Sequence, residues 1–547
     1  MRSILNCLGT CLLLHAAGAV AQVSTPAALN AALGTNAGAA IISLSGVDPL
    51  SCPQVSMSQT WDGGKLIFSD SPESPATRGI LYEDTNLTAT ASGVTNRIFA
   101  YHVNSNSVQM RFSVLIQNNG ASSGTLTVQR SGIAGPSTDY AYAGEVAFLR
   151  WLTNAPGSGI TVTPGQIVRL DTTFDTINTS ENYLLHGIWD YTFTQPHSVI
   201  ICALNTSDNP ITVGPTLPVL ARDSHVRGTF ASCNKIYTNT ATINTTGGIK
   251  QYSLAGNSDN FITGFDNAVS PPTMQTNDGN YGILYKIQMT LASGDGRALG
   301  LVINPRGGAW GGAVNMPAGL FPGGAFLVPA GDGTLSDDTE AVIAGGYSAG
   351  SGTNISMQFM PTGGSSFPVL MVGVPYNAVS PTLAAISNYT VNAGQTVTFT
   401  ASASDTNTNK SLTFSLVNAP ATASIGAMSG LFSWRPPVAS AGSSNSLQVV
   451  VSDGSTPPLT ASRTFAIVVN PLAPVTVTTV SASSGQFQLQ ATGTIGPYYI
   501  LQANASLTNS AGWINLATNT PASSPFTLTD TNAAAFSNRY YRLLLGP

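Results

Sequence analysis

The sequence predicts an all-β protein made of several β-sandwich domains in tandem, with one or two short helices. Apolar and polar residues alternate in short runs from residue 60 onwards, for example with Phe112, Val114 and Ile116 on one side of a strand. Glycine (55 residues) and proline (33 residues) separate these runs, and only 8% of the 547 residues are charged. Period-two runs bounded by turn residues are typical of antiparallel strands with one buried face.

Composition limits the classes of function. A chain of this length suffices for about three to five domains with cores of their own. The hydrophobic fraction of 43% argues against a disordered chain. The formal net charge is −5 and no run of Lys or Arg occurs, which excludes the electrostatic footprint of a protein that binds nucleic acid or an anionic membrane.

Residues 1–21 predict a secretory signal peptide. Arg2 supplies the positive charge, Leu12 to Leu14 lie in a short apolar stretch, and Ala19-Val20-Ala21 forms a cleavage site before Gln22. No later segment sustains about 18 apolar residues, so we expect a mature chain without a transmembrane segment, secreted or held at the cell surface.

Cleavage would leave Cys52, Cys202 and Cys233. Three cysteines cannot staple a chain of this size, so the fold must rest on hydrophobic cores. Two interpretations stay open: a single disulfide between Cys202 and Cys233 with Cys52 left over, or three buried thiols.

Two segments predict short helices. Thr25-Pro26 before residues 27–33, with Gly34 after them, has the cap, first-turn proline and terminal glycine of a helix. Between about residues 143 and 153, Val146, Leu149 and Leu152 recur at helical spacing.

The composition also divides the mature chain. After Tyr376 the acidic residues are only Asp405, Asp453 and Asp530, and glutamate is absent. We therefore expect a linker with a short helix, two β-sandwich domains, a compact β-module and a C-terminal β-domain, at residues 22–46, 47–200, 201–376, 377–471 and 472–547.

A faint repeat connects the two predicted sandwiches. Gly79-Ile80-Leu81-Tyr82 precedes Arg97 and an apolar run that ends at Asn104. Gly282-Ile283-Leu284-Tyr285 precedes Arg297 and an apolar run that ends at Asn304. Duplication of one sandwich domain would explain the match, and chance is the competing explanation for so short a segment.

The segment 381–470 has a recognisable layout. Gly430-Leu431-Phe432-Ser433-Trp434-Arg435-Pro436 lies in its middle, and Asp453-Gly454 follows an apolar strand. This layout resembles the immunoglobulin/cadherin-like repeats of large bacterial surface proteins, which implies an Ig-like sandwich. Some of these families bind Ca²⁺ between modules, and the resemblance implies Asp405, Asn407 and Asp453 as ligands here. Turn capping is the alternative role for these side chains, because the module has no Glu for bidentate binding.

Two further resemblances cover the rest of the chain. Residues 498–547 resemble the C-terminal module of secreted multidomain proteins from verrucomicrobial-type bacteria, which implies a role in export or surface attachment, or plain stabilisation. Residues 65–376 are more loosely similar to secreted proteins labelled copper-amine-oxidase-like, which implies an extracellular β-rich region without a reaction. The motifs behind these resemblances are Tyr499 to Ala503, Pro525 to Asp530, Arg539 to Leu543, Ser69 to Glu73, Gly79 to Tyr82, Arg97 to Asn104 and Asn304 to Gly308.

Catalytic patterns are weak throughout. His102, His186 and His197 lack a metal-binding spacing, so we interpret them as structural histidines rather than as ligands beside Asp190. Asp70 with Glu73 would suit glycoside hydrolysis if they faced each other across a cleft, and a turn is the competing interpretation. We predict no catalytic residue and expect that the protein is not an enzyme.

Exposed tryptophans are the better indication of function. Trp310 lies in the glycine-rich segment 307–312, where its indole would be exposed, and Trp189 is a second candidate. Exposed rings bind glycans by stacking on the apolar faces of sugars, whereas a core position is the alternative for both residues.

Three hypotheses follow. The first is a modular binding or adhesion protein of a bacterial surface or secretome, with a glycan or cell-envelope component as its partner. It would use residues 47–376 for recognition and 377–547 as spacer and anchor. The second is a secreted polysaccharide-directed enzyme with an accessory Ig-like module. The third is a structural envelope or filament subunit, which would need exposed strand edges.

Overall fold

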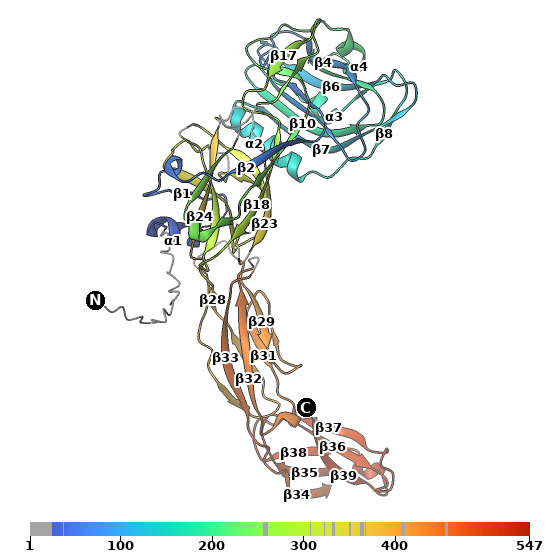
Figure 1. Ribbon diagram of the computed structural model, residues 1–547. Coiled ribbons are helices and arrows are strands. Elements are labelled where there is room, and N and C mark those ends of the chain that lie inside the picture. Colours follow the sequence, from blue (N-terminus) through green and yellow to red (C-terminus); the bar gives the residue numbers. More distant parts are fainter. Residues whose placement is uncertain are drawn as a thin grey trace, which may run out of the picture.

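The computed structural model describes residues 25–546, apart from residues 37, 255–260, 307, 322, 331–333, 349, 351, 361–365, 367, 406–410 and 455–457. The predicted signal peptide and Asn407 lie outside the described residues. Strands dominate the structure and the helices are short, which confirms the all-β prediction of tandem sandwiches (Figure 1).

The first sandwich consists of a large and a small sheet. The large sheet runs in the order β17 (Thr273–Thr276), β16 (Thr263–Asp266), β12 (Arg227–Phe230), β3 (Leu66–Ser69), β5 (Asn96–Val103), β10 (Leu184–Phe193), β7 (Gly124–Ser137), β8 (Ile160–Val162). The small sheet runs in the order β4 (Gly79–Leu87), β11 (His197–Asn205), β6 (Met110–Asn118), β9 (Ile167–Arg169). Alternate residues of both sheets fill the space between them, including Ile98 and Ala100 of β5.

The second sandwich also has two sheets. One runs in the order β1 (Ile41–Ser43), β22 (Glu340–Tyr347), β19 (Ala298–Asn304), β24 (Val369–Tyr376), β15 (Lys250–Leu254). The other runs in the order β2 (Met57–Asp62), β13 (Asn234–Asn239), β18 (Leu284–Ala292), β23 (Thr353–Phe359), β20 (Gly312–Met316), β21 (Gly324–Val328), and β14 (Ile243–Asn244) pairs with β18.

The expected boundary at residue 200 does not separate these sheets. Strands β1 and β2 precede the first sandwich in sequence but belong to the second. Strands β12, β16 and β17 follow that boundary but complete the large sheet of the first sandwich. The chain therefore crosses repeatedly between the two sandwiches.

A single hydrophobic core joins the two sandwiches. Phe99 and Tyr101 project from the face of β5 opposite to Ile98, and they belong to the same cluster as Ile287 and Met357 of the second sandwich. The helix α2 (Tyr140–Thr153) lies at this junction, where it contacts β7 and β10 on one side and β20 and β21 on the other (Figure 1). The two sandwiches thus form one packed unit, which we call the N-terminal pair (residues 25–376).

The strand order supports the predicted repeat. In the first sandwich β4 pairs with β11, β11 with β6, and β5 with β10. In the second, β18 pairs with β23, β23 with β20, and β19 with β22, in the same chain order and all antiparallel. Asn104 directly follows β5 and Asn304 ends β19, and each accepts a hydrogen bond from the backbone N–H of the residue two positions later.

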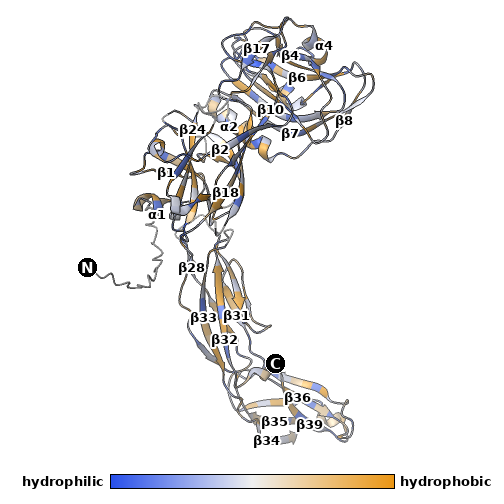
Figure 2. Ribbon diagram, in the orientation of Figure 1, coloured by the Kyte–Doolittle hydropathy of each residue, from blue (hydrophilic) through white to orange (hydrophobic). Residues whose placement is uncertain are grey.

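Residues 377–546 form two smaller sandwiches, which we call the C-terminal pair. The Ig-like one contains β25 (Thr382–Leu383), β26 (Tyr389–Val391), β27 (Val397–Thr400), β28 (Ala403–Ser404), β29 (Thr413–Val417), β30 (Ser424–Ile425), β31 (Leu431–Trp434), β32 (Ser444–Ser452), β33 (Thr460–Val469). The terminal one contains β34 (Thr476–Ser483), β35 (Gln486–Thr492), β36 (Tyr498–Asn504), β37 (Ile514–Asn519), β38 (Phe526–Asp530), β39 (Tyr540–Gly546). Each has its own core, and Figure 2 shows hydrophobic residues along strands such as β32.

The other helices are short. Helix α1 (Ala27–Thr35) confirms the first predicted helix, and α2 confirms the second; α3 (Thr172–Thr176) and α4 (Pro210–Val213) were not predicted. None of the described helices combines the length and the apolar character that crossing a membrane requires.

Cys52, Cys202 and Cys233 are free thiols, so of the two interpretations left open the one with a Cys202–Cys233 disulfide is wrong. Cys202 belongs to a small cluster behind β11, whereas Cys233 belongs to the shared core of the N-terminal pair. The alternative interpretation as buried thiols holds for Cys202 and Cys233, whereas Cys52 is partly exposed.

Candidate ligand-binding site

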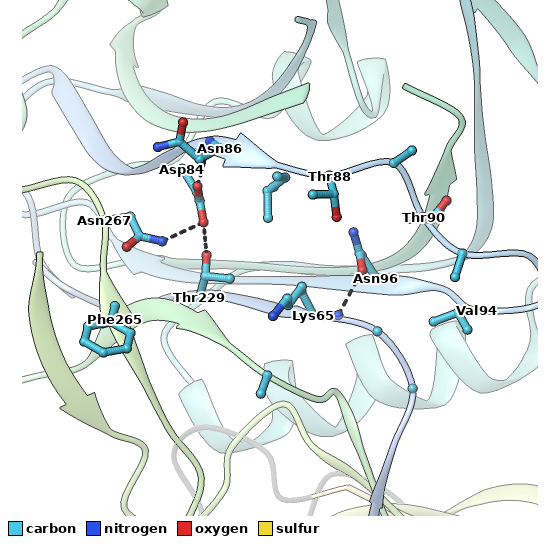
Figure 3. Close-up of a pocket in the computed structure, with 16 residues that line it drawn as sticks. Lys65, Asp84, Asn86, Thr88, Thr90, Val94, Asn96, Thr229, Phe265 and Asn267 are labelled. Carbon is cyan, nitrogen blue, oxygen red and sulfur yellow. Dashed lines mark hydrogen bonds between the residues drawn. The ribbon is translucent and has the colours of Figure 1, made fainter. Parts of the chain in front are cut away.

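A cleft of about 600 Å³ opens in the first sandwich between its two sheets (Figure 3). Strand β4 and the loop after it, residues 88–94, form one side. The other side comes from the large sheet and the segments that flank it, at residues 63–65, 96, 229, 231, 265 and 267. The cleft is therefore assembled from segments that are far apart in the sequence.

Asp84 holds the two sides together. Its carboxylate accepts hydrogen bonds from the Thr229 hydroxyl at 2.6 Å and from the Asn267 amide at 2.7 Å (Figure 3). The Tyr82 hydroxyl lies 2.8 Å from the Thr229 hydroxyl, and it donates there because the hydrogen of Thr229 is directed to Asp84. Burial raises the pKa of Tyr82, which keeps this chain of donors protonated. Asp84 thus fixes the cleft rather than offering a free charge.

Two glycines allow the opposite wall to approach β5. A side chain at Gly64 would place its Cβ 2.5 Å from the Thr95 carbonyl oxygen, and the Gly64 N–H donates to that oxygen at 3.0 Å. Gly63 has a φ of 86°, which favours glycine. The Asn96 side chain then accepts the Lys65 backbone N–H at 2.9 Å, so the rim at residue 65 is fixed in place (Figure 3).

The cleft is rich in neutral polar groups. Amides and hydroxyls of six side chains line it together with a partly exposed aromatic ring: Asn86, Asn96, Asn267, Thr88, Thr90, Thr229 and Phe265. Phe265 is 51% exposed at the rim. Among the described residues that line the cleft, Asp84 is the one carboxylate and Lys65 the one cation. Such a surface suits a ligand with many hydroxyl groups and apolar faces, and it lacks the facing carboxylates of a glycosidase.

The sequence-predicted tryptophans do not reach this surface. Trp310 is fully buried rather than exposed, because it pairs with Leu335 in a β-bridge and its ring packs near Phe359. Trp189 is also fully buried; its indole N–H donates to Asp171 at 2.9 Å and its ring meets the Phe174 ring edge-on. Both residues take the core position that was the alternative to ligand binding.

The proposed calcium ligands are partly brought together. Asp405 and Asp453 line the same small hollow between the second sandwich and the Ig-like module, and Asp453 accepts the Leu459 N–H at 3.0 Å. Asn407 lies outside the described residues. Within the described ranges no group of three or more His, Cys, Asp or Glu side chains is placed to hold a metal ion. Two carboxylates supply fewer than the six to eight oxygens that Ca²⁺ prefers, so these residues do not fit a calcium site by themselves.

The other candidate polar residues have structural surroundings. His102 contacts the Ser69 hydroxyl and the Pro72 carbonyl, and His197 contacts the Tyr191 hydroxyl. His186 lies among aromatic rings. Burial lowers the pKa of His102 to about 4 and of His186 to about 3, so both are neutral at pH 7.

Asp70 and Glu73 lie close enough to interact, but neither lines the cleft. Burial, with the negative charges of Glu73 and Asp223, raises the pKa of Asp70 well above its usual range. His225 bridges Glu73 at 2.7 Å and Asp223 at 3.2 Å. Glu73 and Asp223 thus belong to an ion-pair cluster around His225, and Asp70 is buried beside it.

Sequence reasoning missed the cleft residues. Asp84, Thr229 and Phe265 have no recognisable spacing, since pairing of β12 with β16 and packing of the small sheet against the large one bring them together. The adjacent Gly63 and Gly64 before a strand were the available signal for a close backbone approach.

Comparison with known proteins identifies one module. Residues 380–470 match a family described as "Putative Ig domain". No curated protein matches the chain. Three solved structures align with it: mouse cadherin-23 EC22–24 (15% identity, 40% of this chain, 74% of that chain, TM-score 0.15), human CDH23 EC21–23 (13%, 45%, 87%, 0.15) and protocadherin gamma B2 domains 3–6 (14%, 52%, 83%, 0.16). TM-scores of this size carry no inference about this chain. The chain therefore contains, at residues 380–470, a module similar to Ig domains that follows the N-terminal pair.

Proposed function

We propose that this is an extracellular modular binding protein of a bacterial cell surface or secretome, and that the cleft of its first sandwich binds an uncharged glycan. The C-terminal pair would act as a spacer between the cleft and a point of attachment. The supporting observation is the composition of the cleft.

The cleft offers what a sugar needs. Asn86 and Thr88 lie along one wall and supply an amide and a hydroxyl, whereas the Thr90 hydroxyl beside them is already bonded to the backbone of Phe193. Phe265 is 51% exposed at the rim, and apolar sugar faces stack on such rings. The carboxylate of Asp84 already accepts three hydrogen bonds, from Asn86, Thr229 and Asn267, so a cationic ligand would gain little from it.

Binding can be measured with the chain that follows the predicted signal peptide. Residues 22–547 are incubated with insoluble polysaccharides and cell envelopes, and both depleted protein and released soluble sugar are scored. Oligosaccharides from any polymer that depletes the protein are then titrated by calorimetry. We expect depletion without sugar release, since the cleft lacks a carboxylate pair.

Phe265→Ala tests the site. Loss of one stacking ring weakens binding by about 2- to 12-fold, since such contacts contribute about 0.5–1.5 kcal/mol. Tyr183→Ala is the matched control, because Tyr183 is 39% exposed on the same sandwich and does not line the cleft. Equal affinity of the Phe265→Ala variant and the unsubstituted protein would exclude this cleft as the binding site, and sugar release by the unsubstituted protein would favour the enzyme.

A second candidate function is self-assembly as an envelope subunit. One observation favours it: every residue of β34 is exposed, and β34 lies at the edge of its sheet. Unpaired strand edges are sites of association between chains. Concentration-dependent assembly in the absence of any glycan would support it.

A further inference from the structure

A second cavity, of about 260 Å³, lies at the junction of the two N-terminal sandwiches. Strands β5, β7 and β10 of the first sandwich, helix α2, and strands β13, β18 and β23 of the second contribute side chains to it. It is separate from the glycan cleft, because neighbouring residues of β5 serve the two sites. Asn96 lines the cleft, whereas Arg97 projects from the other face of the strand into the junction.

The cavity carries an excess of positive charge. Three cationic side chains and one carboxylate line it: Arg97, Arg130, Lys286 and Asp190. Arg97 binds Asp190 through two hydrogen bonds of 2.7 and 3.0 Å, and Lys286 pairs with Asp62 at 2.7 Å. No carboxylate of the described chain lies within ion-pair distance of Arg130, whose guanidinium rests 4.9 Å from the centre of the Trp151 ring. Arg130 is therefore the cation left without an anion.

A β-bulge directs two consecutive side chains into the cavity. Neighbours along a strand normally point to opposite faces, yet Gln129 and Arg130 both line this cavity. The pairing of β10 with β7 explains this: Asp190 faces Arg130 and Tyr191 faces Val128, so Gln129 is an extra residue in β7. Bulges of this kind re-aim side chains next to functional sites.

The rest of the lining supplies hydrogen-bond donors. Trp151 is fully buried, and its indole N–H has no partner within the protein. Gln358 accepts a hydrogen bond from Asn315 at 3.2 Å through its carbonyl oxygen, which leaves its amide N–H groups as donors. A buried donor without a partner is costly unless a ligand or water accepts from it.

We propose that this junction cavity binds a small oxyanion, a carboxylate or phosphate group, through Arg130 with the Trp151 indole and the Gln358 amide as further donors. The guanidinium fork of Arg130 matches two oxygens of such a group. The group can belong to a free anion or to an acidic sugar. Because both sandwiches contribute to the cavity, the bound anion would also strengthen their junction.

Thermal unfolding and tryptophan emission test the proposal on the full mature chain. The probes are sodium phosphate, sodium acetate and sodium galacturonate, each against sodium chloride at equal ionic strength. We expect the midpoint of the N-terminal pair to rise with the logarithm of probe concentration and the emission to change with it. Strongest binding of galacturonate would identify an acidic sugar as the source, and strongest binding of phosphate a free anion. The absence of any effect beyond that of chloride would overturn the proposal.

Two variants locate the site. Arg130→Gln weakens the response at least 10-fold, whereas Arg78→Gln, an exposed arginine paired with Asp208, leaves it unchanged. Gln358→Glu keeps the acceptor for Asn315 but adds a negative charge, so it also abolishes the response even if Arg130→Gln folds poorly. Neither variant alters glycan affinity, which distinguishes this site from the cleft. Anion binding that survives both substitutions would place the anion elsewhere.

Discussion

The N-terminal pair and the C-terminal pair are stabilised in different ways. The two N-terminal sandwiches share one core and bury ion pairs such as Arg97–Asp190 between strands. The two C-terminal sandwiches have separate cores, and residues 377–547 contain only three acidic residues. The N-terminal pair contains both the cleft and the cation-lined cavity. A site assembled from distant segments needs walls that do not move, whereas the C-terminal sandwiches are each held by a local core.

The largest expected effect concerns the buried ion pair. Asp190→Ala leaves Arg97, which is 1% exposed, without its carboxylate, and this costs about 4 kcal/mol. Arg97 also donates to the carbonyls of Cys233 and Gly282, which precede strands of the second sandwich. Both sandwiches should therefore unfold earlier and together in calorimetry.

Asp530→Ala is the matched control in the terminal sandwich, where Asp530 pairs with Arg539 at 2.8 Å. It should lower a different transition and leave that of the N-terminal pair in place. If Asp190→Ala destabilised only the first sandwich, the two N-terminal sandwiches would not unfold as one unit.

The next effect is a pH dependence restricted to the N-terminal pair. Burial, with a smaller contribution from Asp139, raises the pKa of Glu145 on α2 to about 8 from the ordinary value of 4.5. Between these values the folded chain keeps a proton that the unfolded chain has lost, so stability falls as pH rises from about 4.5 to about 8. Each pKa unit corresponds to about 1.4 kcal/mol, which makes the loss a few kcal/mol.

Glu145→Gln should flatten this slope in urea titrations between pH 5 and pH 9. Asp175, whose pKa burial raises to about 6, contributes in the same direction and leaves a residual slope. If stability depended on pH in the same way in the variant, the ionisation of Glu145 would not cause the loss of stability.

The comparison also shows what the sequence could predict. Local patterns predicted α1, α2 and strands such as β6, because helix caps and period-two alternation act within a few residues. The boundary at residue 200 failed because strand partners lie far apart, as in the pairing of β2 with β13. Composition near residue 377 was informative, since the loss of acidic residues there coincides with the start of the Ig-like module, which has a core of its own.

The sites were harder to predict than the fold. Glycines around Trp310 suggested an exposed loop, but Gly311 instead lets the chain pass Glu145: a Cβ there would lie 1.9 Å from a Glu145 oxygen. Phe265 stands in an ordinary alternating strand, and only its register opposite Met274 at the sheet edge leaves it exposed. Exposure depends on the last layer of packing, which sequence periodicity does not specify.

A smaller effect is expected at the joint between the two C-terminal sandwiches. Arg435 donates to the carbonyls of Gly394 at 2.8 Å and Gly496 at 3.3 Å, and its guanidinium lies 4.2 Å from the centre of the Tyr498 ring. Arg435→Gln should cost about 1 kcal/mol and broaden the distribution of distances between labels on the two domains. Arg463→Gln, which loses a contact within the Ig-like module, should leave that distribution unchanged. Equal broadening in both variants would show that the joint does not depend on Arg435.

The smallest effect on stability concerns the exposed edge strand β34, where Val480 is 61% exposed. A bulge near Thr478 interrupts only the beginning of the strand, and no charged residue protects the remainder. Val480→Lys should change the unfolding free energy by no more than about 0.5 kcal/mol and reduce self-association in sedimentation, because charges block edge pairing. Val468→Lys introduces the same charge on an exposed face of β33, which has partners on both sides. If both variants reduce association equally, apolar exposure rather than the free edge of β34 drives association. That outcome would contradict an assembly role for this edge strand.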